Sequence, residues 1–162
     1  MTSKPSLVSV IMPAYKLQYM EQVLDSLLSQ SYSELELIVC DDSTDGDIAT
    51  LLQQKQEQAD FPIHYFKNGL RLGETVSTAK GIKKAKGKYI KLLHDDDVLE
   101  PDAIASLVAA IESEPDIALV SSRRQRIDED GEPLPDILAT RFPFASDVII
   151  NGPELVSFLG DH

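Results

Sequence analysis

The chain has 162 residues, and its 15 Lys and Arg against 27 Asp and Glu give a formal net charge of −12. This excess of acids argues against non-specific nucleic-acid binding and against docking on an anionic membrane. Hydrophobic residues make up 43%, which suits a folded domain and excludes a disordered acidic chain. The single cysteine, Cys40, excludes an internal disulfide and a cysteine-based zinc site, and it fits a reduced, cytoplasmic setting.

Short apolar runs predict strands over residues 7–12, 35–40, 62–66, 88–93 and 117–121. Between them, helical spacing and end signals predict helices over residues 19–30, 45–58, 75–86 and 101–112. This alternation predicts an α/β fold with a mainly parallel sheet and helices on both faces. No apolar run reaches the roughly 18 residues of a membrane-spanning helix.

The alternation ends after residue 122. A polar stretch follows, with a turn signal at Asp130 and Gly131, and a further helix is predicted over residues 152–159. We therefore expect two parts, residues 1–122 and 123–162, of which the second is incomplete.

Special or polar residues follow three of the predicted strands, at the edge where ligands bind in parallel α/β sheets. They are Pro13, Ala14 and Tyr15 after the first strand, Asp41 and Asp42 after the second, and His94, Asp95, Asp96 and Asp97 after the fourth. We expect these three tips to converge on one candidate site.

The acidic tips allow two interpretations. Three consecutive Asp residues repel one another unless a divalent cation with a preference for oxygen ligands lies between them, but they could equally form a solvated loop that caps the next helix. Asp41 and Asp42 could cap a helix too, while Asp42 is also placed to accept a hydrogen bond from a ligand N–H. Among the basic residues between the tips, most are expected on the solvent face of a helix, and Arg71 and Lys80 are the better candidates for a diphosphate.

The sequence has no G-x-G-x-x-G and no G-x-x-x-x-G-K-[ST] motif, so dinucleotide-type and P-loop phosphate sites are unsupported. A phospho-acceptor receiver domain would share the five-stranded parallel sheet, but it needs an acidic pair after the first strand. Here that strand ends in Pro13, Ala14 and Tyr15.

Three segments in order, residues 8–15 (VSVIMPAY), 37–46 (LIVCDDSTDG) and 85–102 (AKGKYIKLLHDDDVLEPD), closely resemble the family 2 glycosyltransferases of GT-A fold. The resemblance covers residues 8–122 and weakly the remainder. It implies a transferase that moves a sugar from a nucleotide-diphospho-sugar to an unidentified acceptor, with inversion. It also implies that residues 1–122 are the donor-binding half and 123–162 the start of the acceptor side.

The resemblance also implies roles by position. Pro13, Ala14 and Tyr15 would line the nucleotide base, and Asp42 would hydrogen-bond it, with uracil and hence a UDP-sugar favoured. Asp95 would approach the ribose, Asp96 would hold Mg²⁺ or Mn²⁺ at a D-x-D-type motif, and Asp97 would be a further acidic group. Arg71 and Lys80 would complete the nucleotide contacts.

Only about 65 residues follow the metal motif, which is short for the acceptor half that the resemblance implies. We therefore assign no general base and expect it beyond residue 162. A non-catalytic nucleotide-binding module stays open as an alternative. Apolar side chains near the C-terminus predict self-association, and a longer parent protein could be peripheral at a membrane.

Overall fold

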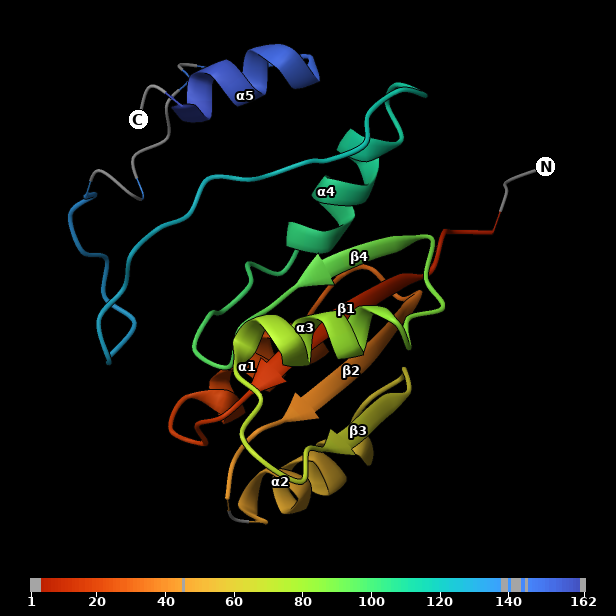
Figure 1. Cartoon of the computed structure of the whole chain (residues 1–162), viewed down its shortest axis with the longest axis vertical. Coiled ribbons are helices and arrows are strands. Elements are labelled where there is room, and N and C mark those ends of the chain that lie inside the picture. Colours follow the sequence, from red (N-terminus) through yellow and green to blue (C-terminus); the bar gives the residue numbers. More distant parts are fainter. Residues whose placement is uncertain (1–3, 45, 138–139, 141–143, 145, 161–162) are drawn as a thin grey trace. The chain divides into compact units, whose positions relative to one another are not determined.

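The computed structural model describes residues 4–44, 46–137, 140, 144 and 146–160, with side chains described up to residue 156 (Figure 1). The chain divides into two compact units, Met1–Ala118 and Leu119–His162. The first unit contains strands β1 (Val8–Ala14), β2 (Leu35–Asp41), β3 (Ile63–Lys67) and β4 (Tyr89–Leu92). Its helices are α1 (Met20–Leu28), α2 (Asp47–Gln56), α3 (Glu74–Ile82) and α4 (Ala103–Ile111).

The four strands form one sheet in the order β3-β2-β1-β4, and every pair is parallel. The register sets Val8 opposite Leu35 on one side and Tyr89 on the other. All four strands therefore end at the same edge, where the predicted tips were expected to meet.

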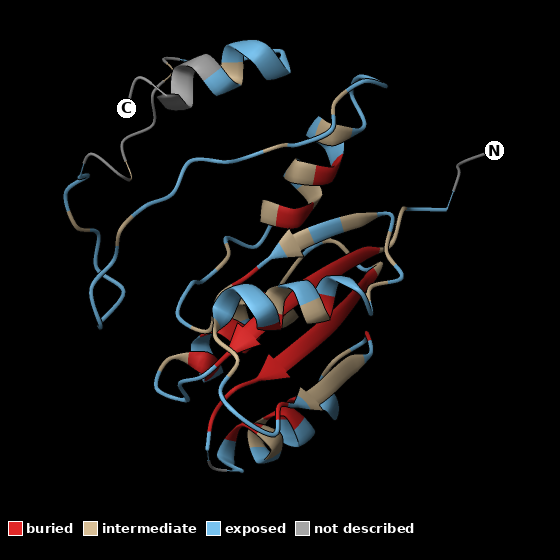
Figure 2. Cartoon of the chain, viewed as in Figure 1, coloured by how far each residue is buried: buried red, intermediate tan, exposed pale blue. Residues whose placement is uncertain are grey.

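Strands β1 and β2 are buried along their whole length, as Figure 2 shows. On one face Val10, Met12, Leu37 and Val39 share a core with residues of α1, α2 and α4. The other face carries a smaller cluster of Ile11, Ile38 and Cys40, and α3 lies over it (Figure 1). Helices thus cover both faces of the sheet, which confirms the predicted fold class.

Close packing explains the glycine in α3. A Cβ at Gly81 would lie 2.5 Å from Cγ2 of Ile11. The helix approaches the central strand so closely only because this position has no side chain.

The sequence predicts that the first strand ends at Met12, but β1 continues through Pro13 and ends at Ala14. The N–H of Val8 points toward β2, and the carbonyl of Ile11 faces β4, where it accepts from Leu93 N–H at 3.1 Å. Because this direction alternates along the strand, the backbone nitrogen of Pro13 points toward β4. Pro13 lies beyond Ile11, the last residue of β1 that pairs with β4, so the missing N–H of the proline costs no ladder hydrogen bond.

The predicted strand over residues 117–121 is wrong. These residues join no ladder of the sheet within the described part of the chain, and Leu119 is 72% exposed. The run has strand-like composition, but a strand forms only where a neighbour completes its hydrogen bonds, and composition does not report that neighbour.

In the second unit, the predicted turn forms where Gly131 donates to the carbonyl of Asp128 at 3.1 Å. Gly131 has φ 84°, which favours glycine. Helix α5 (Gly152–Gly160) begins with a reciprocal cap between Asn151 and Glu154. Among the described residues, none of the helices has the length and apolar character needed to cross a bilayer.

Candidate functional site

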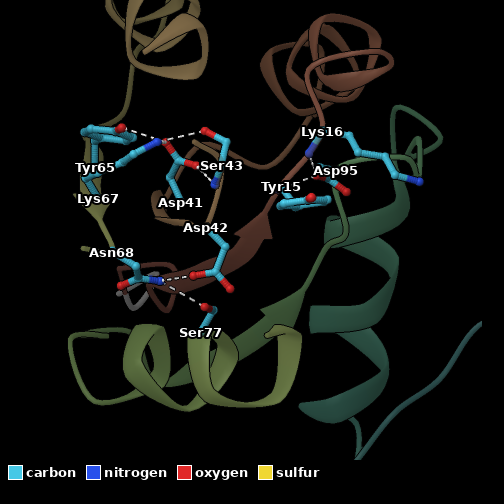
Figure 3. Close-up of polar contacts among 10 residues, drawn as sticks. All are labelled: Tyr15, Lys16, Asp41, Asp42, Ser43, Tyr65, Lys67, Asn68, Ser77 and Asp95. Carbon is cyan, nitrogen blue, oxygen red and sulfur yellow. Dashed lines mark hydrogen bonds and ion pairs between the residues drawn. The ribbon is translucent and has the colours of Figure 1, made fainter. Parts of the chain in front are cut away.

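The candidate site lies where β1, β2 and β3 end and where the segment after β4 begins (Figure 3). These ends carry the predicted residues Tyr15, Asp42 and Asp95, together with polar residues from β3 that the sequence analysis did not select.

Asp41 is fully buried at the end of β2, and its carboxylate holds the local structure together. It accepts hydrogen bonds from Tyr65 Oη at 2.7 Å, Lys67 Nζ at 2.9 Å and Ser43 N–H at 2.6 Å. Burial by itself raises the pKa of Asp41, but these hydrogen bonds outweigh burial and lower it. Asp41 therefore fixes the turn after β2 through its bond to Ser43 and ties that turn to β3 through Tyr65 and Lys67.

Asp42 is 5% exposed and is held by four groups of the chain. Its Oδ1 accepts from Asn68 Nδ2 at 2.6 Å, and its Oδ2 accepts from the N–H groups of Leu72 at 3.1 Å and Gly73 at 2.7 Å. Burial raises the pKa of Asp42, whereas these bonds and the Ser77 hydroxyl lower it, with a net lowering. The ionised carboxylate of Asp42 thus holds the segment from residue 68 to residue 73 in place through hydrogen bonds.

That segment places Arg71 over the ring of Tyr15, with the guanidinium carbon 4.0 Å from the ring centroid. The backbone of Tyr15 is held as well, because Oδ2 of Asp95 accepts from the N–H groups of Tyr15 and Lys16, each at 2.7 Å. Tyr15 is 41% exposed, so the ring remains accessible. The structure therefore brings together three predicted nucleotide contacts, Tyr15, Arg71 and Asp95.

Other predicted contacts lie deeper than expected. Pro13 and Ala14 are buried, and Ala14 contributes its carbonyl, which accepts from Asp42 N–H at 2.8 Å. The ammonium of Lys80 is bound to Oδ1 of Asn68. Ala14 is thus held to Asp42, and Lys80 to Asn68.

Asp96 and Asp97 are exposed at the start of the segment after β4. His94 lies beside them, with Nδ1 3.3 Å from Oδ2 of Asp97 and Nε2 3.0 Å from Oε1 of Glu74. Among the described residues no three His, Cys, Asp or Glu side chains are grouped to hold a metal ion. Mg²⁺ commonly takes one or two carboxylates together with substrate phosphates, so the exposed carboxylate of Asp96 fits a site shared with a substrate.

The sequence analysis missed Asn68 and Ser77. Asn68 follows β3 directly, at the same sheet edge as the other tips. Applying the rule about strand ends to the third strand as well would have selected it.

The sequence profile described as "Glycosyl transferase family 2" matches residues 9–155. An uncharacterized glycosyltransferase of Methanocaldococcus jannaschii is 29% identical over 85% of this chain and 48% of its own length. The chain thus spans about half the length of this relative.

Two solved structures share the fold. A mannosyltransferase from Pyrobaculum calidifontis, in complex with GDP-Man and Mn²⁺, has a TM-score of 0.63 and 24% identity, over 70% of this chain and 34% of that one. TarS of S. aureus in complex with UDP has a TM-score of 0.58 and 23% identity, over 65% and 32%. The fold is that of the GT-A glycosyltransferases.

Proposed function

The chain belongs to glycosyl transferase family 2, and on that premise we propose that it binds a nucleotide-diphospho-sugar at the carboxyl edge of its sheet. The observation that carries this proposal is the meeting of Tyr15, Asp42, Arg71 and Asp95 at that edge. In the whole protein the sugar would pass to an acceptor that is still to be identified, with inversion. Because the chain belongs to this family, we no longer consider a phospho-acceptor receiver domain.

The base would stack against the ring of Tyr15, which Arg71 already covers on one side. Asp42 would accept an N–H of the base edge, because its lowered pKa keeps the carboxylate ionised at neutral pH. Structural neighbours bind UDP in one case and GDP-Man in another. Both bases offer a ring N–H, and we favour UDP as the first probe.

Asp96 would hold Mg²⁺ or Mn²⁺, with Asp97 beside it. When bound, such a cation neutralises the charge that develops on a departing diphosphate. Arg71 would add positive charge near the same group. The proposal assigns no catalytic base. Asp128, an acidic residue after the site, already accepts from the N–H groups of Asp130 and Glu132 at 3.0 Å and 2.9 Å.

Calorimetric titration of the chain with UDP, with and without Mn²⁺, tests the proposal. We expect binding that Mn²⁺ strengthens. Asp96→Ala should abolish that strengthening and leave the fold intact, because Asp96 is exposed. Asp116→Ala, which removes an exposed carboxylate after α4, is the matched control and should behave like the wild type. A folded chain that binds no nucleoside diphosphate would refute the proposal.

A binding module without transfer is the second candidate, since the chain covers only about half the length of its relative. It predicts the same titration but no release of UDP from a UDP-sugar, even when acceptors are supplied. We propose a cytoplasmic location, since the free thiol of the buried Cys40 fits a reducing compartment. If a longer parent protein carries an anchor, we expect that protein to be peripheral to a membrane.

A further inference from the structure

Asn68 has a side-chain amide whose orientation is fixed from both sides. The residue is 4% exposed. Its Nδ2 donates to Oδ1 of Asp42 at 2.6 Å and to Oγ of Ser77 at 3.0 Å (Figure 3). Its Oδ1 accepts from the ammonium of Lys80. A flipped amide would set its oxygen against the carboxylate and its NH₂ against the ammonium, so only one orientation is stable.

The backbone of Asn68 is fixed as well, because its N–H donates to the carbonyl of Asp41 at 2.8 Å and so continues the β2–β3 ladder. The amide therefore projects from a rigid strand end and not from a loose loop. A carboxylate that accepts from such a donor is held in one rotamer.

The position of Asn68 links two groups that are expected at the donor nucleotide. The proposed function assigns Asp42 to the base, and the sequence predicts Lys80 near the diphosphate. Asn68 lies between the two charges and contacts both. No other described side chain donates to one and accepts from the other.

We propose that Asn68 is a positioning residue for nucleotide specificity, an inference that rests on the proposed function. It orients the Asp42 carboxylate toward the base edge and thereby sets a preference for a base that presents a ring N–H. Asn68 acts through Asp42 and does not itself contact the nucleotide. Ser77 supports it by fixing the second N–H of the amide.

UDP and CDP are the probes, because uracil presents a ring N–H where cytosine has a bare ring nitrogen. Calorimetric Kd values for both, at fixed Mn²⁺, give a CDP/UDP ratio for each variant. A hydrogen bond to a charged group is typically worth enough for roughly a tenfold change in affinity. We expect Asn68→Ala to lower the ratio about tenfold, mainly by weakening UDP, and Ser77→Ala to lower it about threefold.

Gln30→Ala is the matched control, because Gln30 is also an amide with partners on both sides. Its Nε2 donates to the carbonyl of Glu100 at 2.7 Å, and its Oε1 accepts from Ile104 N–H at 3.1 Å, away from the sheet edge. Gln30→Ala should cost stability but leave the CDP/UDP ratio unchanged, which separates positioning from general loosening.

The role is refuted if Asn68→Ala keeps the wild-type ratio, or if Gln30→Ala lowers it equally. Should Asn68→Ala not fold, the Ser77→Ala ratio decides in the same way. A folded wild type that binds neither nucleotide overturns the proposed function, and this role with it. Binding without any change of ratio overturns this role alone.

Discussion

Replacing Asp41 by Asn tests whether the buried carboxylate organises the edge of the sheet. Asn has the same shape, but its NH₂ would face a donor in either orientation, Lys67 Nζ and Tyr65 Oη at the Oδ2 position or Ser43 N–H at the Oδ1 position. Breaking a buried ion pair costs about 3–5 kcal/mol. Lys67 is 36% exposed, so solvent screens part of this, and we expect a loss of about 2 kcal/mol.

For a chain of this size, such a loss corresponds to a Tm lowered by about 4–8 °C. The assay is thermal unfolding followed by circular dichroism from about pH 8 downward. Because the folded-state pKa of Asp41 lies below its unfolded value, its stabilisation is fully present above the unfolded pKa. It is lost as the pH falls through the folded pKa. The offset between the two proteins should stay constant to about pH 5 and shrink below about pH 4.

Lys67→Met removes the other partner and serves as the second arm of a double-mutant cycle. Because Asp41 and Lys67 contact each other, the losses of the single variants should add to more than that of the double variant. An offset under about 0.5 kcal/mol at neutral pH, additive losses, or an offset that already shrinks between about pH 7 and 6 would refute this reasoning.

Other predictions concern the packing at Gly81, the hydrogen bonds that Asp95 accepts from the backbone of Tyr15 and Lys16, and self-association. Gly81→Ala should destabilise by about 1–2 kcal/mol in urea unfolding, since the added Cβ meets Ile11 in a filled core, whereas Gly69→Ala, with open space around it, should change stability by under about 0.5 kcal/mol. Asp95→Ala should weaken UDP binding about tenfold by calorimetry, because Tyr15 loses its backbone anchor; unchanged affinity would contradict that role. Sedimentation velocity should show concentration-dependent association, driven by apolar side chains such as Ile149, which is 71% exposed; a monomer at all concentrations would contradict it.

The sequence was sufficient to predict the parallel sheet and the convergence of its tips, because alternation of apolar runs and helical spacing is a local property. It also selected Tyr15, Arg71 and Asp95, which the structure brings together. It did not predict which carboxylate oxygens accept hydrogen bonds from other groups of the chain. Oδ2 of Asp42 accepts from the N–H groups of Leu72 and Gly73, which are backbone groups about thirty residues away, and no side-chain pattern reports them.

The same limit explains the errors. Residues 117–121 have the composition of a strand but no neighbour in the sheet of the described residues. Pro13 suggested a strand end, but its position opposite the end of β4 makes it harmless. In each case the deciding fact is what lies across a long-range contact, which composition and spacing do not encode.

The acidic residues of the edge divide into two kinds, according to whether the chain itself donates hydrogen bonds to their carboxylates. Asp41, Asp42 and Asp95 accept hydrogen bonds from the chain and bracket the loops that carry Tyr15 and Arg71. Asp96 is exposed at the same edge. A buried carboxylate without such donors would be neutral or strongly destabilising, so Asp41 and Asp42, which are buried and accept from the chain, are stable without a cation. A cation is therefore expected to change Asp96 and its neighbours while leaving the base-binding side in place, which predicts that UDP binding weakens but survives when Mn²⁺ is removed.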